Sequence, residues 1–193
     1  MELKFSNLSL DEILSLYKFN LYYGSSSEHF YSNELVINWA EKQVMQNNDS
    51  EILLIIASLG LDKQIDSDEV ITYLKRYLAK KNIAIPDINY SSLIVLKLLI
   101  QKIISSNNLN DIDFLLSSFV FKYIDLDNKY FHKITKYWLF IYYDYFARYE
   151  EPNCYYPKEQ LCEKKQYDKI KFLAKRFYTL LNNKEMVQFL AKY

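Results

Sequence analysis

Few residues in this chain have side chains of the kinds that catalyse reactions or bind metals. The two histidines, His29 and His132, stand about 100 residues apart, and neither has a second ligand at a metal-binding spacing. The two cysteines, Cys154 and Cys162, are separated by seven residues, which matches no zinc or redox motif. A Cys–His pair could form in space, but nothing in the sequence predicts one. We therefore expect surface or capping histidines, reduced thiols, no catalytic residues and no metal site.

Carboxylates cluster in two segments that resemble calcium-binding loops. The first segment contains Asp62, Asp66, Asp68 and Glu69, and the second is D-L-D-N at 125–128. Neither has the alternating oxygen ligands, the glycine and the final glutamate of an EF-hand loop, and helix capping explains both better. The only two glycines, Gly24 and Gly60, cannot form the Gly-rich loops that bind nucleotide phosphates. The sequence therefore predicts no cofactor and favours a protein that is not an enzyme.

Charge is distributed unevenly along the chain, although the net charge is zero. Residues 1–69 include twelve acidic and four basic residues, whereas residues 70–193 include twelve acidic and twenty basic ones. If the two parts are separate in space, the first would attract a basic partner and the second an acidic one, mainly by speeding their encounter.

Basic residues are densest near the C-terminus, where aromatic residues are interleaved with them. The set comprises Lys158, Lys164, Lys165, Lys169, Lys171, Lys175 and Arg176. Lysines beside aromatic rings could bind a nucleic-acid strand through phosphate contacts and base stacking. The sequence favours a simpler explanation, because lysines on a helix usually form its solvated face and the neighbouring residues fall at core spacing. These predicted core stripes are Phe172, Arg176 and Thr179, and Leu173, Phe177 and Leu180.

The elements that carry these residues are predicted to be helices. Two glycines and three prolines are too few for a protein built from tight β-turns, and capping boxes begin at Ser9 and Asp66. The runs ILLII and LIVLKLLI could be strands by periodicity, but their caps and the lack of hairpin turns favour helices. The predicted helices span about 10–23, 33–46, 51–59, 67–81, 91–105, 110–124, 128–150, 157–181 and 184–191.

We expect an all-α protein, with residues 1–193 forming a single domain of eight or nine helices. Short connections favour antiparallel helix pairs, packed as an irregular bundle or an α–α layered stack. Ser50 is the expected cap of the helix at 51–59, which is apolar around most of its circumference and should lie at the centre. Ser91 or Ser92 should open the fifth helix and Asn110 the sixth.

Two helices have predicted faces that the structure can test. The helix at 33–46 should bury Leu35, Trp39 and Val44 or Met45. The helix at 128–150 has aromatic residues on nearly every side. It is either a core helix whose tyrosine hydroxyls reach the margin, which we favour, or a partly exposed helix whose rings anchor an interface.

The N-terminal sequence has charges at Glu2 and Lys4 and no uninterrupted apolar region, so we expect no secretory signal. The longest uninterrupted apolar runs, at 52–57 and 138–143, are shorter than the roughly 20 residues of a membrane helix. We therefore expect a cytoplasmic protein that does not span a membrane.

Two segments of the N-terminal half carry a family resemblance. The segments FYSNELVINWAE (Phe30–Glu41) and ILLIIASLGLD (Ile52–Asp62), in a small helical chain with an acidic front, resemble helical immunity proteins of bacterial polymorphic-toxin systems, including contact-dependent growth inhibition. The resemblance implies a cytoplasmic protein that binds and neutralises one cognate toxin domain, often a nuclease. The acidic charge of residues 1–69 is compatible with binding to a basic nuclease cleft.

We therefore favour a protein-binding inhibitor over three alternatives, which are a helical scaffold or regulatory domain, a nucleic-acid-binding regulator, and an unrecognised enzyme. The cognate toxin domain is the expected partner, and the sequence does not predict an oligomeric state. The expected contact combines acidic residues near the ends of the early helices with aromatic anchors. These residues are Asp49, Glu51, Asp62, Asp66, Asp68, Glu69, Tyr22, Tyr23 and Tyr31.

Overall fold

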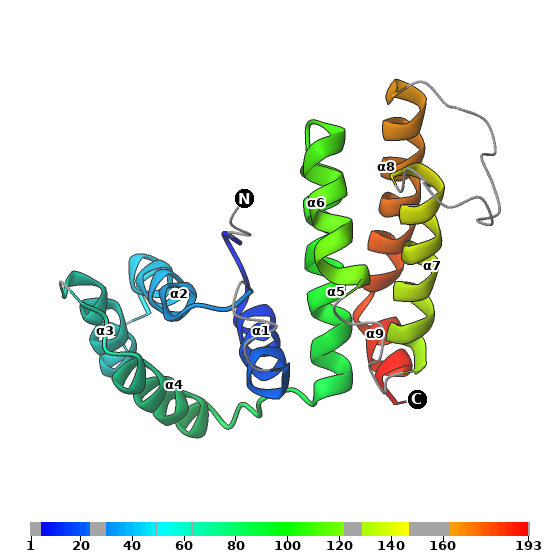
Figure 1. Cartoon of the computed structure of the whole chain (residues 1–193). Helices are drawn as coiled ribbons and strands as arrows, with labels where there is room; N and C mark the ends of the chain where they lie inside the picture. Colours follow the sequence, from blue (N-terminus) through cyan, green and yellow to red (C-terminus); the bar gives the residue numbers. More distant parts are fainter. Residues whose placement is uncertain are drawn as a thin grey trace. The chain divides into compact units, whose positions relative to one another are not determined.

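The computed structural model describes residues 5–23, 30–48, 50–62, 64–121, 129–146 and 163–192. Within these ranges the chain forms nine α-helices, one short 3₁₀ turn at Leu59–Leu61 and no strand, which confirms the all-α prediction (Figure 1). The predicted bounds of the first, fourth and last helices match the structure. The helices are α1 (Leu10–Tyr23), α2 (Asn33–Met45), α3 (Glu51–Ser58), α4 (Ser67–Lys81), α5 (Ile88–Ser105), α6 (Leu109–Val120), α7 (Lys129–Tyr145), α8 (Glu163–Leu181) and α9 (Lys184–Ala191).

Side-chain caps begin α1, where the sequence predicts one, and α9. The amide of Ser9 donates to Glu12 Oε2 at 3.0 Å, and the amide of Glu12 donates to Ser9 Oγ at 3.3 Å. This reciprocal pair is a capping box, which satisfies two of the amides that a helix leaves without intrahelical partners. At α9, the amide of Met186 donates to Asn183 Oδ1 at 3.0 Å.

The start of α5 differs from its prediction. The helix begins at Ile88, just after Pro86, and the amide of Tyr90 donates to Asp87 Oδ1 at 2.9 Å. Ser91 and Ser92, the expected first residues, are buried inside the helix. Asp87 takes the capping role because it follows Pro86 directly, where the helix can first begin, and its carboxylate accepts an amide of the first turn.

Two further predicted caps are wrong in detail. Helix α6 begins at Leu109, where Asn108 Oδ1 accepts the amide of Asp111 at 2.8 Å, so Asn110 lies within the first turn. Ser50 occupies the position before α3, but its side chain makes no capping bond and its hydroxyl has no hydrogen-bond partner. The boundary of α3 is therefore set by packing of its apolar residues.

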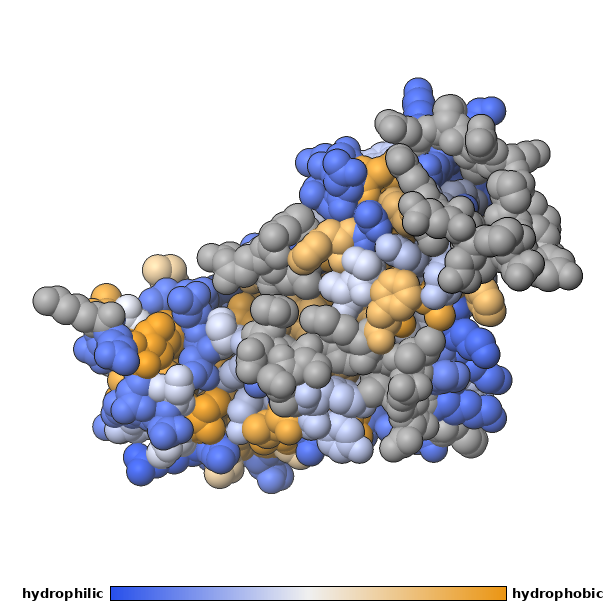
Figure 2. Space-filling model, viewed as in Figure 1, coloured by the Kyte–Doolittle hydropathy of each residue, from blue (hydrophilic) through white to orange (hydrophobic). Residues whose placement is uncertain are grey.

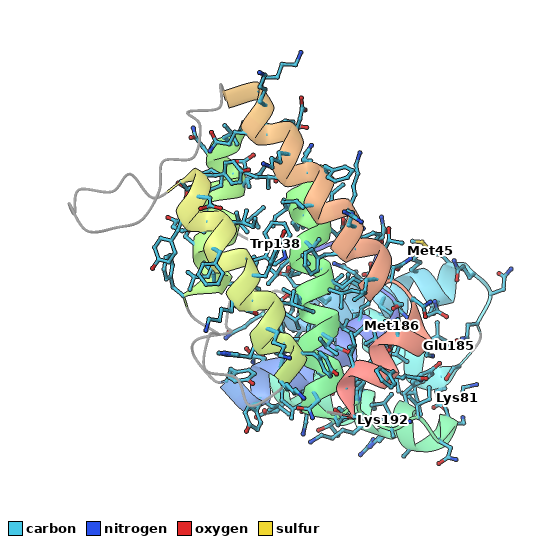
Figure 3. All side chains as sticks on the ribbon, turned by 90° about the vertical axis from the view of Figure 1, so that its right-hand side faces the viewer. Met45, Lys81, Trp138, Glu185, Met186 and Lys192 are labelled. Atoms are coloured by element: carbon cyan, nitrogen blue, oxygen red, sulfur yellow. The ribbon has the colours of Figure 1, made fainter. Side chains whose placement is uncertain are left out.

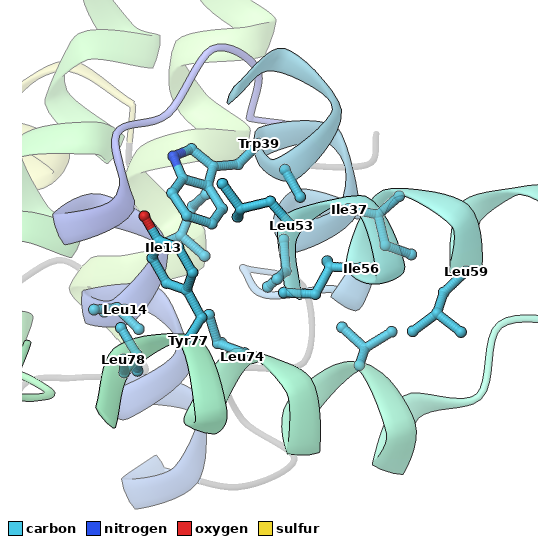
Figure 4. Packing of buried hydrophobic residues seen from close by; sticks show 13 residues of the cluster. Ile13, Leu14, Ile37, Trp39, Leu53, Ile56, Leu59, Leu74, Tyr77 and Leu78 are labelled. Atoms are coloured by element: carbon cyan, nitrogen blue, oxygen red, sulfur yellow. The ribbon is translucent and has the colours of Figure 1, made fainter. Parts of the chain in front are cut away.

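The chain divides into two compact units, residues 1–91 and 92–193, and each is described by itself. The expected single domain remains a prediction. In unit 1 (residues 1–91), helices α2, α3 and α4 pack against one another, and α1 adds Ile13 and Leu14 to their shared core (Figure 4). The rings of Trp39 and Tyr77 meet edge to face at 5.4 Å between centroids.

The buried faces of α2 and α3 differ from the predicted ones. Helix α2 buries Val36, Ile37, Trp39 and Ala40, whereas Met45 is exposed and Leu35 and Val44 are only half-buried. Helix α3 is not central, because it buries one side against α2 and α4 and leaves Leu54 exposed. In α4, the helical spacing of Val70, Tyr73, Leu74, Tyr77 and Leu78 predicts one apolar stripe, and the structure confirms it, with Tyr73 half-buried and the other four buried.

Unit 2 (residues 92–193) contains α6 to α9 and most of α5. Helix α7 has one buried side, which includes Phe131 and Trp138, and Trp138 lies among the helices of this unit (Figure 3). Its other side exposes Tyr137, Phe140 and Tyr143. Some aromatic residues of α7 therefore belong to the core and others are exposed, because only one side of a helix with aromatic residues on all sides packs against the core.

Helix α8 runs antiparallel to α7. Near the start of α8, Gln166 Nε2 donates to the carbonyl of Tyr145 at the end of α7, and closer to the end of α8 the ring of Phe177 lies 5.2 Å from that of Tyr137. The predicted core stripe of Phe172, Arg176 and Thr179 is wrong, since all three are exposed. Leu180 is also exposed, and the residues that α8 buries fully are Ile170, Ala174 and Leu181.

Helix α5 is the one helix in the described ranges that is long and apolar enough, by length and composition, to cross a membrane. Its residues from Ser91 to Leu96 and from Leu98 to Ile100 are buried by protein. The core helix of a soluble protein has the same length, composition and burial.

Candidate protein-binding surface

The predicted acidic contact residues are exposed side chains of α3, of α4 and of the turn that joins them. Glu51 lies in the first turn of α3, Asp62 follows the 3₁₀ turn, and Asp68 and Glu69 lie in the first turn of α4. All four are exposed to solvent. Asp49 lies outside the residues that the structure describes.

Asp66 is exposed as well, and it caps α4. Its Oδ1 atom accepts the amides of Asp68 at 2.9 Å and of Glu69 at 3.1 Å. The positive end of the helix dipole stabilises these three carboxylates where they cluster. The structure thus confirms the cap that the sequence predicts at this position.

Two exposed leucines lie beside these acids. Leu61 is 85% exposed and directly precedes Asp62, and Leu54 is 49% exposed. Leu54 follows Glu51 by three residues, so these two side chains lie on the same side of α3, and Leu61 ends the 3₁₀ turn that follows this helix. Sequence reasoning missed both leucines because it assigned this apolar segment to the centre.

We call this set the acidic surface. It consists of Glu51, Leu54, Leu61, Asp62, Asp66, Asp68 and Glu69. In the space-filling view, apolar side chains interrupt the hydrophilic ones over α3 and α4 (Figure 2). A few apolar side chains bordered by charged ones is the usual composition of a protein–protein interface.

Among the predicted aromatic anchors, Tyr31 makes its contacts within unit 1. Its ring is half-buried and lies 5.4 Å from that of Tyr17, and its hydroxyl donates to Asn33 Oδ1 at 3.0 Å. Burial, with a smaller effect of Tyr17, raises the pKa of the Tyr31 hydroxyl well above its ordinary value. Tyr31 therefore stabilises the start of α2 and presents little surface to a partner.

Tyr22 and Tyr23 end α1. Tyr22 is 57% exposed, and its ring meets that of Tyr23 edge to face at 4.9 Å. The Tyr23 ring lies 4.5 Å from that of the buried Phe19, so Tyr23 belongs to the edge of the core. Tyr22 is the predicted aromatic anchor that the structure leaves accessible.

The structure does not join the tyrosines of α1 to the acidic surface. In Figure 4, Ile13 and Leu14 of α1 lie beside Tyr77 and Leu78, in the C-terminal half of α4. Asp62, Asp66, Asp68 and Glu69 lie just before or within the first turn of α4, which has 15 residues and is therefore about 22 Å long, whereas Glu51 lies at the other end of α3. The predicted contact set thus separates into two parts of unit 1.

The residues considered for metal chemistry are mostly outside the described ranges, which include His132 but not His29, Cys154 or Cys162. His132 is half-buried in α7 and interacts with neighbouring groups. Within the described part of the chain, no group of three His, Cys, Asp or Glu residues could hold a metal ion.

Comparison of the chain with protein-family models, curated proteins and solved structures finds no match.

Proposed function

We propose that this protein is a cytoplasmic binding protein that inhibits a basic partner domain through the acidic surface. Following the resemblance to helical immunity proteins, the partner is a bacterial toxin domain. The observation that supports this proposal is the exposure of Leu61 directly before Asp62 and the capped start of α4, and of Leu54 one turn after Glu51, with all five carboxylates exposed. The leucines supply apolar contact area, and the carboxylates attract and orient a basic surface.

A capped helix N-terminus makes this surface well suited to fast association. Asp66 is held by two amide hydrogen bonds, and Asp68 and Glu69 follow it on the rigid first turn of α4. Charges whose positions are fixed before binding lose little conformational entropy when the complex forms. Their field extends about 10 Å at moderate ionic strength, so it acts before contact.

The proposal predicts that the gene of this protein lies next to a large toxin gene, and the test uses the C-terminal domain of that toxin. We expect a one-to-one complex and survival of cells that express both proteins. In the triple variant Asp62→Lys, Asp68→Lys and Glu69→Lys, the association rate constant at low salt should fall at least about tenfold, because electrostatic steering is worth about 10 to 10³ in rate. Asp66 is left intact so that α4 keeps its cap.

A matched control carries the same change of charge on exposed acids of unit 2, Asp144→Lys, Asp168→Lys and Glu185→Lys. Its association rate constant should change much less than that of the first variant. Failure to protect cells would refute the inhibitor function. If both variants reduce the association rate constant equally, only the net charge of the protein matters and the acidic surface is not the contact.

A further inference from the structure

Helix α8 presents a strongly basic face to solvent. Its fully buried residues, Ile170, Ala174 and Leu181, lie on one side of the helix. At 100° per residue, the exposed residues fall on the opposite side, where Lys165, Lys169, Phe172 and Arg176 follow one another at intervals of three and four. We call the exposed set the basic face, which consists of Lys164, Lys165, Lys169, Phe172, Lys175 and Arg176.

Phe172 stands in the middle of this face. Its side chain is 59% exposed, and the guanidinium carbon of Arg176 lies 5.6 Å from the centre of its ring. Lys169 precedes it by three residues, and Asp168 is the one acid among the exposed side chains described on α8. An exposed phenylalanine contributes nothing to the core, whereas a ring flanked by cations can stack on a flat anionic ligand.

Helix α7, which packs beside α8, also exposes lysines and aromatic rings. Lys169 of α8 places its ammonium 5.9 Å from the ring of Tyr145 in α7. The outer side of α7 exposes Phe140, which is 57% exposed, together with Lys133 and Tyr137. Two antiparallel helices of unit 2 thus carry exposed lysines and exposed aromatic rings side by side.

We propose that this surface of α7 and α8 binds single-stranded nucleic acid. Lysine and arginine side chains would contact the phosphates, and Phe172 and Phe140 would stack on unpaired bases. Phosphate contacts and stacking on bases do not distinguish the two sugars, so we expect RNA and DNA strands to bind alike. The proposal does not depend on the inhibitor function, because it concerns a different unit of the chain.

Charge and aromatic exposure together favour single-stranded nucleic acid over three other occupants. An anionic membrane would require a broad apolar side directed outward, but the apolar side of α8 is buried and Phe172 stands among charges. An acidic protein could cover the rings as well as the lysines, but a nucleotide carries a phosphate and a flat base in one unit, which matches a ring flanked by cations more closely. Paired bases of a duplex would leave the rings without a stacking partner, because the faces of paired bases are already stacked.

The test measures the binding of fluorescein-labelled oligo(dT) and oligo(U) to the whole chain by fluorescence anisotropy. We expect similar affinities for both strands and a steep loss of affinity with salt. One variant combines three charge reversals on α8, Lys165→Glu, Lys169→Glu and Arg176→Glu. These changes should weaken binding at least about tenfold. They should also reduce the salt slope by about 0.7 for each phosphate that the variant no longer neutralises.

Phe172→Ala separates stacking from charge. It should weaken binding about fivefold or more while the salt slope stays the same, because stacking on an aromatic side chain is worth about 1–3 kcal/mol per base. A matched control reverses three exposed lysines of unit 1, Lys75→Glu, Lys80→Glu and Lys81→Glu, and should have a much smaller effect. Circular dichroism and thermal unfolding check that all variants fold, which their exposed positions favour.

Three results would overturn the proposal. The first is no binding of either oligonucleotide at low salt. The second is an equal loss of affinity in the α8 and control variants, which would indicate attraction by net charge alone. The third is a preference for another anionic partner. It would be seen as unchanged oligonucleotide binding in Phe172→Ala with polyglutamate competing as well as unlabelled oligonucleotide, or as binding to anionic phospholipid vesicles but not to oligonucleotides.

Discussion

Gly60 lies so close to Ile37 that a β-carbon on the glycine would come within 2.7 Å of Ile37 Cγ2. Ile37 is buried in α2, and its β-branched side chain has few alternative rotamers. The contact therefore fixes how closely the 3₁₀ turn after α3 approaches α2. It also explains the glycine, which otherwise only marks the end of a helix in the sequence.

Gly60→Ala should lower the free energy of unfolding by about 1–3 kcal/mol, because the added methyl group overpacks a filled site. Urea unfolding monitored by circular dichroism measures the change. Ser58→Ala, at an exposed position of the same segment, should change stability by less than about 0.5 kcal/mol. In an Ile37→Ala background the cost of Gly60→Ala should largely disappear, and full additivity of the two changes would contradict this explanation.

Thr135→Val should stabilise the protein. The Thr135 hydroxyl is fully buried in α7 and has no hydrogen-bond partner. Replacing it with a methyl group of similar shape removes an unsatisfied polar group, whose burial costs about 1–3 kcal/mol. Thermal unfolding should show a higher Tm, whereas Thr135→Ser, which keeps the hydroxyl and removes the methyl, should show a lower one. A lower Tm for Thr135→Val would indicate that the hydroxyl is satisfied in solution.

Asp66→Ala should lower the free energy of unfolding by about 1 kcal/mol, as is typical for loss of an N-cap. The carboxylate accepts two amides that would otherwise lack partners at the start of α4. Asp66→Ser should retain most of the stability, since serine is also a good cap. Asp62→Ala, which removes a nearby exposed carboxylate, should have little effect, so equal losses of stability in Asp62→Ala and Asp66→Ala would refute the capping role.

Stability should fall at alkaline pH. Burial raises the pKa of Tyr90 above its ordinary value of 10.0, and the hydrogen bond that its hydroxyl donates to Asp11 Oδ2, at 2.7 Å, adds to the effect. The folded state therefore holds this proton more tightly than the unfolded state. The contribution is fully present below about pH 10 and is lost as pH rises toward the folded-state pKa.

Urea unfolding between pH 8 and pH 11 tests this linkage. The free energy of unfolding should decline above about pH 10, and the decline should be shallower in Tyr90→Phe, which has no hydroxyl to titrate. Asp11→Asn should also make it shallower, because it removes the charge that opposes tyrosinate formation. Identical pH dependence in the wild type and Tyr90→Phe would rule out Tyr90 as the source.

Local sequence signals were sufficient to predict that these segments are helices and to place the bounds of α1, α4 and α9. The Ser9–Glu12 pair and the Asp66 cap depend on residues within three positions of each other, so their geometry follows from the backbone of one turn. The apolar stripe of α4 was equally predictable because its polar and apolar residues separate cleanly around the helix. The exposure of Asp62, Asp68 and Glu69 followed from their charge.

Which side of a helix faces the core was decided by tertiary structure wherever a helix has apolar residues on more than one side. Helical periodicity places Phe172 and Arg176 on one face of α8 and Ile170 and Ala174 on the opposite one, but it does not show which of the two faces is buried. For the same reason Leu54 and Leu61, both apolar in sequence, became exposed neighbours of the acids. Burial depends on which helices pack together over long separations in the chain, and one helix by itself does not specify its neighbours.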